Sequence, residues 1–284
     1  MNGRTLLVAG VVAVSLASAG GCAPLENEGE GDVGSAASAA IGLNALSPLA
    51  LDATASYSTA LTPAMLSGTA LAPDGLGGAA LAAIEDQGAS GALSRQLLSY
   101  TVGCALGPTQ SFAFSWTDGS SVTHSESYAG VFGLATDWQS QPIAAAEQPW
   151  ISACLIARVN YYGVHVTLSC RGDDAALGTT PAEISDFPYQ EGAFWGDLFS
   201  ATPTAYACDY VPDAAHSEAA WRVCSSGSDA RGNAVSCGIL QPLGSCTALC
   251  APLTGAGGQY YPGCAVDPTS AATLTSEVIT VFLQ

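Results

Sequence analysis

The chain contains no lysine, and this absence limits what it can bind. Its six basic residues are all arginine, against 24 Asp and Glu, so the formal net charge at pH 7 is −18. Nucleic acids and anionic lipid headgroups are recognised by clustered cations on a protein surface. We therefore expect no nucleic-acid partner.

The N-terminus lacks an apolar run long enough to cross a bilayer as a helix, which takes about 20 residues. Arg4 is followed by an apolar run of 11 residues, Leu6 to Leu16, and then by small residues up to Gly21. A short apolar run between a cation and a small-residue cleavage region is typical of a secretory signal peptide. We predict that residues 1–21 direct export.

Cys22 closes the stretch Ala-Gly-Gly-Cys, which resembles the lipobox of bacterial lipoproteins, where the cysteine is lipidated. Residues 22–38 are polar, small and acidic, and predict a flexible tether. Ala23, rather than Asp, after the cysteine is compatible with the outer membrane. We expect this lipid to hold the chain at the bacterial outer membrane or cell surface. The alternative is a soluble secreted form, because Ala19 replaces the usual Leu of the lipobox.

Residues 39–83 repeat with a period of five that matches neither a helix nor a strand. The third position is Leu or Ile in all pentads but one, and Pro48, Pro63 and Pro73 would interrupt regular structure. The pattern resembles pentapeptide repeats, which form a right-handed β-helix with the central Leu inside, although Ala replaces the usual Asn or Asp. We expect either a short β-helix or an extended stalk. The pentads are AAIGL, NALSP, LALDA, TASYS, TALTP, AMLSG, TALAP, DGLGG and AALAA.

Residues 84–284 have the pattern of one globular domain, with a Cys-rich part from about 204 to 284. Helical and strand periods are interspersed without a βαβ rhythm, which predicts an α+β fold. The expected helices span 90–104 and 142–160, the expected hairpin spans 112–128, and the expected strands span 164–170, 204–211 and 276–283.

Nine cysteines follow Cys22, and an exported chain should oxidise most of them. Cys170 ends an alternating apolar run, so we expect it to keep a buried thiol. We favour a bridge between Cys104 and Cys154, which joins two expected helices, and three bridges within 208–264. The eight expected disulfide cysteines are Cys104, Cys154, Cys208, Cys224, Cys237, Cys246, Cys250 and Cys264.

A metal centre or cofactor is not expected. Cys246 and Cys250 have a spacing that suits a metal, but no nearby histidine accompanies them and an oxidising compartment favours disulfides. The chain has three histidines in all, and the usual hydrolase and nucleotide-binding motifs are absent.

The richest aromatic segment is 187–199, where five aromatic residues lie among carboxylates. Rings beside carboxylates suit carbohydrate, which makes Tyr189, Glu191, Trp195 and Asp197 candidate ligand-binding residues. Glu191 and Asp197 are also a candidate acid and base for a glycosidase. The alternative is that the aromatics belong to the core.

His124 and Glu126 are a second candidate catalytic pair, because two residues i and i+2 on a strand share a face. A three-residue hairpin loop would place His124 opposite Phe114, and a two-residue loop would place it opposite Ala113. An exposed polar strand is the alternative.

Several segments together resemble a group of exported, myxobacterial-type lipoproteins with an N-terminal NALxP tract. The resemblance implies export and this architecture, and it supplies no catalytic residues. The segments are NALSP, TALTP, SYTVGCAL, FAFSWTDG, FGLATDW, PWISACLIARVNYYGV and PYQEGAFWGDLF.

We therefore expect an exported, lipid-anchored cell-envelope protein with a disulfide-stapled α+β domain that binds a glycan or an envelope protein. No reaction can be assigned, and the balance is against an enzyme. The alternatives are a secreted carbohydrate-active hydrolase using Glu191 and Asp197, and a purely structural envelope component.

Overall fold

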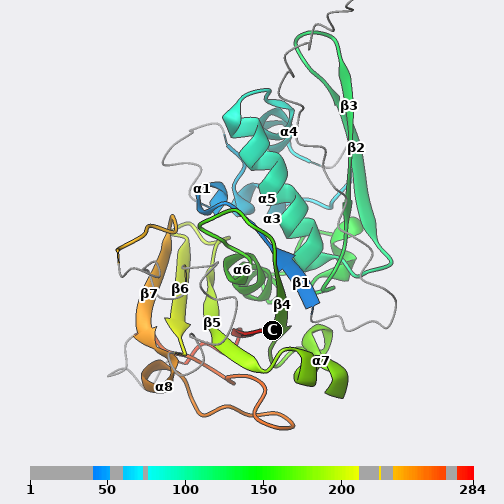
Figure 1. Cartoon of the computed structure of the whole chain (residues 1–284). Coiled ribbons are helices and arrows are strands. Elements are labelled where there is room, and N and C mark those ends of the chain that lie inside the picture. The colour runs from blue at the N-terminus through cyan, green and yellow to red at the C-terminus, as the bar shows by residue number, and fades with distance from the viewer. Residues whose placement is uncertain (1–40, 52–59, 73–75, 211–223, 225–232, 267–273) are drawn as a thin grey trace, which may run out of the picture. The chain divides into compact units, whose positions relative to one another are not determined.

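A six-stranded mixed sheet forms the centre of the fold in the computed structural model (Figure 1). The structure describes residues 41–51, 60–72, 76–210, 224, 233–266 and 274–284, so the expected signal peptide and tether lie outside it. All neighbouring strands of this sheet are antiparallel except β6 and β7, which are parallel. In spatial order the strands are β1 (Ile41–Asn44), β4 (Val166–Arg171), β8 (Ile279–Leu283), β5 (Tyr189–Asp197), β6 (Thr204–Asp209) and β7 (Leu240–Ser245).

Both faces of the sheet are covered, which explains why most residues of its central strands β4, β8 and β5 are buried. Helix α6 (Gln148–Ala157) contacts β5, β6 and β8 on one face, and every residue from Ile151 to Ala157 is buried. On β5, Phe194 belongs to the core that includes α6, whereas the next residue, Trp195, packs with the short helix α8 (Cys246–Leu249). Alternate residues of β5 therefore face two different cores.

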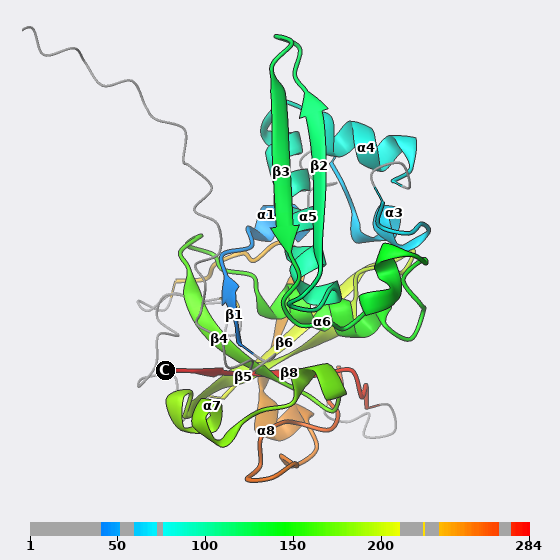
Figure 2. The ribbon, with the colours of Figure 1, turned by 90° about the vertical axis from the view of Figure 1, so that its right-hand side faces the viewer.

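Outside α6 lies the long helix α5 (Ala89–Ala105), and the hairpin of β2 (Ser111–Thr117) and β3 (Thr123–Ala129) lies along α5 (Figure 2). Asp86 precedes α5 and stabilises its N-terminus. The Asp86 Oδ1 accepts hydrogen bonds from the backbone N–H groups of Gly88, at 2.8 Å, and Gly91, at 3.1 Å. Within the described residues, no helix combines the length and the apolar character needed to span a bilayer. The remaining short elements are the helix α7 (Pro181–Asp186) and the 3₁₀ helices η1 (Thr136–Gln139) and η2 (Ala175–Leu177).

The described part of the pentad segment packs into this fold. It forms β1, α1 (Pro48–Leu51), α3 (Pro63–Ser67) and most of α4 (Gly78–Glu85), rather than coils of a β-helix. The leucines at the third pentad position point inward as expected, but into the core shared with α5 and α6; those with less than a tenth of their surface exposed are Leu46, Leu51, Leu61, Leu66, Leu71 and Leu76. Ser38–Gln284 is one compact unit, and the described pentads contribute to its core.

A buried polar network attaches α7 to the sheet. Arg171 donates from Nε to Ser169 Oγ and from Nη2 to the carbonyl of Phe187, both at 2.8 Å. Ser169 Oγ in turn donates to Glu183 at 2.8 Å. Burial lowers the pKa of Arg171 to about 10 and raises the pKa of Glu183. Each buried charge has polar partners, so we assign this network a structural role.

Four disulfides connect these elements. Cys104–Cys154 joins α5 to α6, the pairing expected from the sequence. The other three lie within 208–264, and Cys170 carries a buried thiol. They are Cys208–Cys246, Cys224–Cys237 and Cys250–Cys264.

Candidate functional site

The aromatic segment on β5 does not form a surface for sugar. Trp195 is 1% exposed and Glu191 is 2% exposed, so the indole face is not available for stacking on a ligand. Tyr189 is half-buried. Asp197 caps a turn, because its Oδ1 accepts hydrogen bonds from the backbone N–H groups of Phe199, at 2.9 Å, and Ser200. Of the four predicted ligand-binding residues, Glu191 and Trp195 are therefore buried in the fold, and Asp197 holds a turn.

Glu191 and Asp197 are also too far apart to act as a glycosidase pair. Both lie on β5, and six residues of a strand span roughly 20 Å. Acid and base in glycosidases are about 5 to 10 Å apart. The two carboxylates therefore cannot flank one glycosidic bond.

The hairpin places His124 opposite Trp116 and Glu126 opposite Phe114, so neither predicted register occurs. The reason is the turn, which Asp118 organises over five residues, 118–122. Its backbone N–H donates to Val122 O at 2.9 Å, and its Oδ1 accepts from the N–H groups of Ser120, at 2.8 Å, and Val122, at 2.9 Å. The second strand therefore begins at Thr123.

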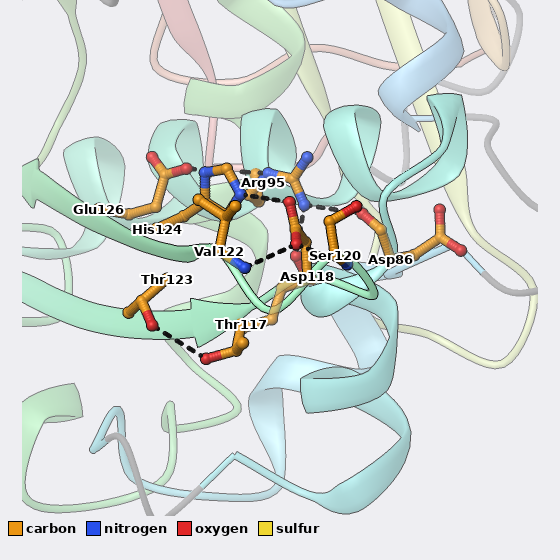
Figure 3. A network of polar contacts seen from close by, with 10 residues as sticks. Asp86, Arg95, Thr117, Asp118, Ser120, Val122, Thr123, His124 and Glu126 are labelled. Carbon is orange, nitrogen blue, oxygen red and sulfur yellow. Dashed lines mark hydrogen bonds and ion pairs between the residues drawn. The ribbon is translucent and has the colours of Figure 1, made fainter.

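This turn brings together a polar and aromatic cluster, which we call the tip cluster: Arg95, Trp116, Asp118, His124 and Glu126. Figure 3 shows its polar members Arg95, Asp118, His124 and Glu126. His124 Nε2 lies 3.0 Å from Asp118 Oδ2. The imidazole stacks on the Trp116 ring, with 4.3 Å between centroids and 19° between planes. The Arg95 guanidinium carbon lies 4.5 Å from the centroid of the same indole.

Arg95 connects the tip cluster to the helices beneath it. Its Nη1 donates to the carbonyls of Ile84, at 2.6 Å, and Asp86, at 2.9 Å, which lie at and just beyond the end of α4. Its Nε lies 3.9 Å from Glu126 Oε1. Of the predicted pair, Glu126 is thus bound to Arg95, and the carboxylate that orients His124 is Asp118.

The electrostatics of the tip cluster follow from these contacts. The hydrogen bond from His124 lowers the pKa of Asp118, and the backbone N–H of Val122 lowers it further. Burial raises the pKa of Tyr128, on the same face of β3, and the charge of Glu126 adds to this.

An oriented histidine suits general base chemistry, which also requires a group to activate. Among the described residues, no hydroxyl or thiol hydrogen bonds to the His124 imidazole. The contacts of His124 with Asp118 and Trp116 instead stabilise the turn by holding its two ends together. Sequence reasoning selected His124 and missed Asp118, whose position six residues upstream becomes adjacent only through the five-residue turn.

The outer face of the hairpin has a different composition from the inner face. Its residues alternate with the aromatic ones and are all exposed, small and uncharged. Ser115 Oγ lies 3.0 Å from Ser125 Oγ, and Thr117 Oγ1 lies 3.2 Å from Thr123 Oγ1. The paired positions are Ser111–Ala129, Ala113–Ser127, Ser115–Ser125 and Thr117–Thr123.

The outer edge of β2 is open. Gln110 O accepts from the N–H of Gly130 and Asp118 N–H donates to Val122 O, so even-numbered residues turn their backbone groups towards β3. Odd-numbered residues therefore turn theirs away, as Ser111 does when its carbonyl accepts from Gln139 at 2.9 Å. Within the described chain, the backbone groups of residues 113, 115 and 117 have no hydrogen-bond partner.

Comparisons with protein families, with curated proteins and with solved structures found no match. The function must therefore be argued from the site itself. Its three parts are the open β2 edge, the small uncharged outer face and the tip cluster that holds the turn.

Proposed function

We propose that this chain is an exported, lipid-anchored envelope protein that binds an extended segment of another envelope protein, which adds as a third strand to the edge of β2. The observation that carries the proposal is the row of outward backbone groups at Ala113, Ser115 and Thr117. Strand addition uses such main-chain donors and acceptors for affinity.

The edge carries none of the usual protection against pairing with another chain. Natural edge strands are commonly blocked by Lys, Pro or outward charges. The seven residues of β2 are Ser-Phe-Ala-Phe-Ser-Trp-Thr, with no charge and no proline. Small outward side chains also leave room for a partner's side chains beside them.

The tip cluster supports the same role, because it fixes the conformation of the edge before binding. An isolated two-stranded hairpin is marginal in water. Here the His124–Asp118 contact closes the turn, and Arg95 connects the inner face to α4 and α5. A preorganised edge loses less conformational entropy on binding than a mobile one.

Export and anchoring are supported by the N-terminal sequence and by the cysteine chemistry. Four disulfides are typical of a protein that folds in an oxidising compartment. The anchor is tested with radiolabelled palmitate. Label should enter the wild-type chain and be lost in Cys22→Ser. Equal labelling of both, or of neither, would overturn the anchor.

Partner binding is tested by photocrosslinking in intact cells of the source bacterium. p-Benzoylphenylalanine replaces Ala113, beside the open edge, or Tyr161, an exposed residue outside the hairpin. We expect a discrete adduct from position 113 and none of that mass from position 161. No adduct at 113 would overturn the proposal, and an adduct of twice the chain mass would make the partner a second copy.

A proline at the edge distinguishes strand addition at β2 from binding of the partner to the outer face of the hairpin. Ser115→Pro removes an outward N–H that the hairpin does not use, whereas Ser115→Ala keeps it. The adduct should disappear in Ser115→Pro and persist in Ser115→Ala. Should Ser115→Pro fail to fold, Ser115→Lys supplies a blocking charge with the N–H retained. An adduct that survives both blocking variants would show that the edge is not used.

A further inference from the structure

The loop between α6 and β4 is a tight turn built around the buried side chain of Asn160. The Asn160 Nδ2 donates to the carbonyl of Val164 at 2.7 Å, and its Oδ1 accepts from the backbone N–H of Tyr162 at 2.9 Å. Gly163 has a φ of +65°, which glycine adopts readily, and its N–H donates to the carbonyl of Asn160 at 3.2 Å. Hydrogen bonds to Asn160 therefore determine the conformation of this turn.

The turn holds apolar side chains in the solvent. Tyr161 is 45% exposed, Tyr162 is 44% exposed and Val164 is 38% exposed. The two tyrosine rings contact each other edge to face, with 5.3 Å between their centroids. The fold thus keeps two aromatic rings outside the core.

A second exposed apolar residue group adjoins this turn through the backbone. The N–H of Leu46 donates to the carbonyl of Arg158 at 3.2 Å, and the carbonyl of Leu46 accepts from the N–H of Asn160 at 2.9 Å. Leu49, on α1, follows three residues later and is also exposed. We call the four side chains of Leu49, Tyr161, Tyr162 and Val164 the apolar patch. They are four of the seven large apolar side chains that are exposed in the described part of the chain, so exposed apolar surface is concentrated here.

The segments that carry the apolar patch have no charged residue. The chain has 24 acidic residues, yet residues 41–51 and 159–170 contain no Asp, Glu, Lys or Arg. These segments can approach a bilayer without desolvating a charge and without repelling lipid phosphates. Tyrosine is also enriched at the interface between lipid and water, because its ring is apolar and its hydroxyl is polar.

The N-terminal part of the chain joins the fold beside the apolar patch. The described fold begins with β1, in which the Oδ1 of Asn44 accepts from the N–H of Val166 at 2.9 Å, two residues after Val164. Between Cys22 and β1 lie 18 residues, 23–40, which reach at most about 60 Å. A lipid on Cys22 would therefore keep the apolar patch close to the bilayer and raise its effective concentration there.

We propose that the apolar patch docks on the surface of the bilayer that holds the Cys22 lipid, with both tyrosine rings at the level of the headgroups. The inference rests on the proposed lipid anchor, but it uses residues that take no part in strand addition at β2. The lipid and the apolar patch together fix the orientation of the chain on the membrane, which a lipid on a long tether does not do alone.

Docking is tested on phosphatidylcholine vesicles that contain radiolabelled phospholipid and a maleimide lipid. The maleimide couples to Cys22 of the oxidised mature chain, 22–284, because Cys170 is buried. Coupling supplies the anchor chemically, so this test does not depend on whether cells lipidate Cys22, which palmitate labelling decides separately.

The readout is photocrosslinking to lipid. p-Benzoylphenylalanine replaces Tyr162 or, as a control of similar exposure, Val122 in the hairpin turn. We expect severalfold more lipid label on the chain from position 162 than from position 122. Equal labelling of both positions, or no label from position 162, would overturn the proposal. An adduct of twice the chain mass in place of lipid would also overturn it, and would make the apolar patch a contact between two copies.

A double variant tests whether the tyrosines hold the apolar patch on the bilayer. With p-benzoylphenylalanine at Leu49 as the reporter, lipid label should fall severalfold in Tyr161→Ser/Tyr162→Ser and stay unchanged in the matched control Val122→Ser. All three substituted side chains are exposed, so the fold should tolerate the changes. Unchanged label in the double variant would contradict docking through the tyrosines.

Discussion

The imidazole of His124 lies 3.0 Å from the carboxylate of Asp118, between the two ends of the hairpin turn, and stacks on Trp116 in the opposite strand. One side chain thus connects the turn, the first strand and the second strand. The conformation of the hairpin should therefore respond to the ionisation of Asp118.

The hairpin should lose stability in acid. Because the pKa of Asp118 is lowered in the folded chain, its stabilising contribution is present above the unfolded value of about 3.9 and is lost as the pH falls through the lower folded value. Urea unfolding at pH 6 and at successively lower pH should show a smaller acid-induced loss in Asp118→Asn than in the wild type. Asp137→Asn, an exposed control in η1, should behave like the wild type. Identical acid profiles for all three would contradict this role of Asp118.

The pentad leucines should contribute to the stability of the whole fold. Leu66 is fully buried in the core shared with α5, so Leu66→Ala should lower the free energy of unfolding by about 2 to 5 kcal/mol. Leu49 lies in the same segment but is 49% exposed, so Leu49→Ala should change it by less than about 0.5 kcal/mol. Equal effects in chemical denaturation would mean that the segment does not share the core.

A methyl group at Gly192 should disrupt the pairing of β5 with β6. A Cβ there would lie 2.1 Å from the backbone oxygen of Cys208, which cannot move without breaking the ladder. Gly192→Ala should lower the free energy of unfolding by about 1 to 3 kcal/mol. Gly68, after α3, has a φ of −79° and open space around it, so Gly68→Ala should be neutral or stabilising by up to about 1 kcal/mol. Thermal unfolding of both variants measures this difference in stability.

Loss of the α5–α6 disulfide should destabilise the chain more than loss of the bridge at Cys224. The two bridges close loops of 50 and 13 residues. From the entropy of loop closure, we expect the free energy of unfolding to fall by about 4 kcal/mol in Cys104→Ala/Cys154→Ala and by about 3 kcal/mol in Cys224→Ala/Cys237→Ala. Denaturant midpoints under oxidising conditions should follow this order. The reverse order would show that loop entropy is not the dominant contribution.

Local periodicity predicted the two longest helices, the hairpin and the strands β4, β6 and β8, but not the strands β1, β5 and β7 or the short helices. The helix expected at 90–104 occurs at Ala89–Ala105, and the strand expected at 164–170 occurs at Val166–Arg171. These segments have one apolar face at a single period. The helix expected over 142–160 is shorter, Gln148–Ala157, with Pro149 in its first turn.

Other features of the fold and of the candidate site depend on long-range contacts, which local periodicity does not predict. β5 is buried on both faces, so its aromatic residues gave the same sequence signal as an exposed binding surface would. The partners of the pentad segment depend on pairing such as Ile41 with Ser169, far along the chain. The carboxylate beside His124 depends on the length of one turn, which the hydrogen bonds of Asp118 determine.

The position of β8 has a consequence for how the sheet is assembled. This strand, Ile279–Leu283, is the last of the six in the chain, yet it lies between β4 and β5 in the middle of the sheet. Without β8, the strands would form two separate groups, β1–β4 and β5–β6–β7, each with an unpaired inner edge. The two halves of the sheet can therefore join only when β8 inserts between β4 and β5.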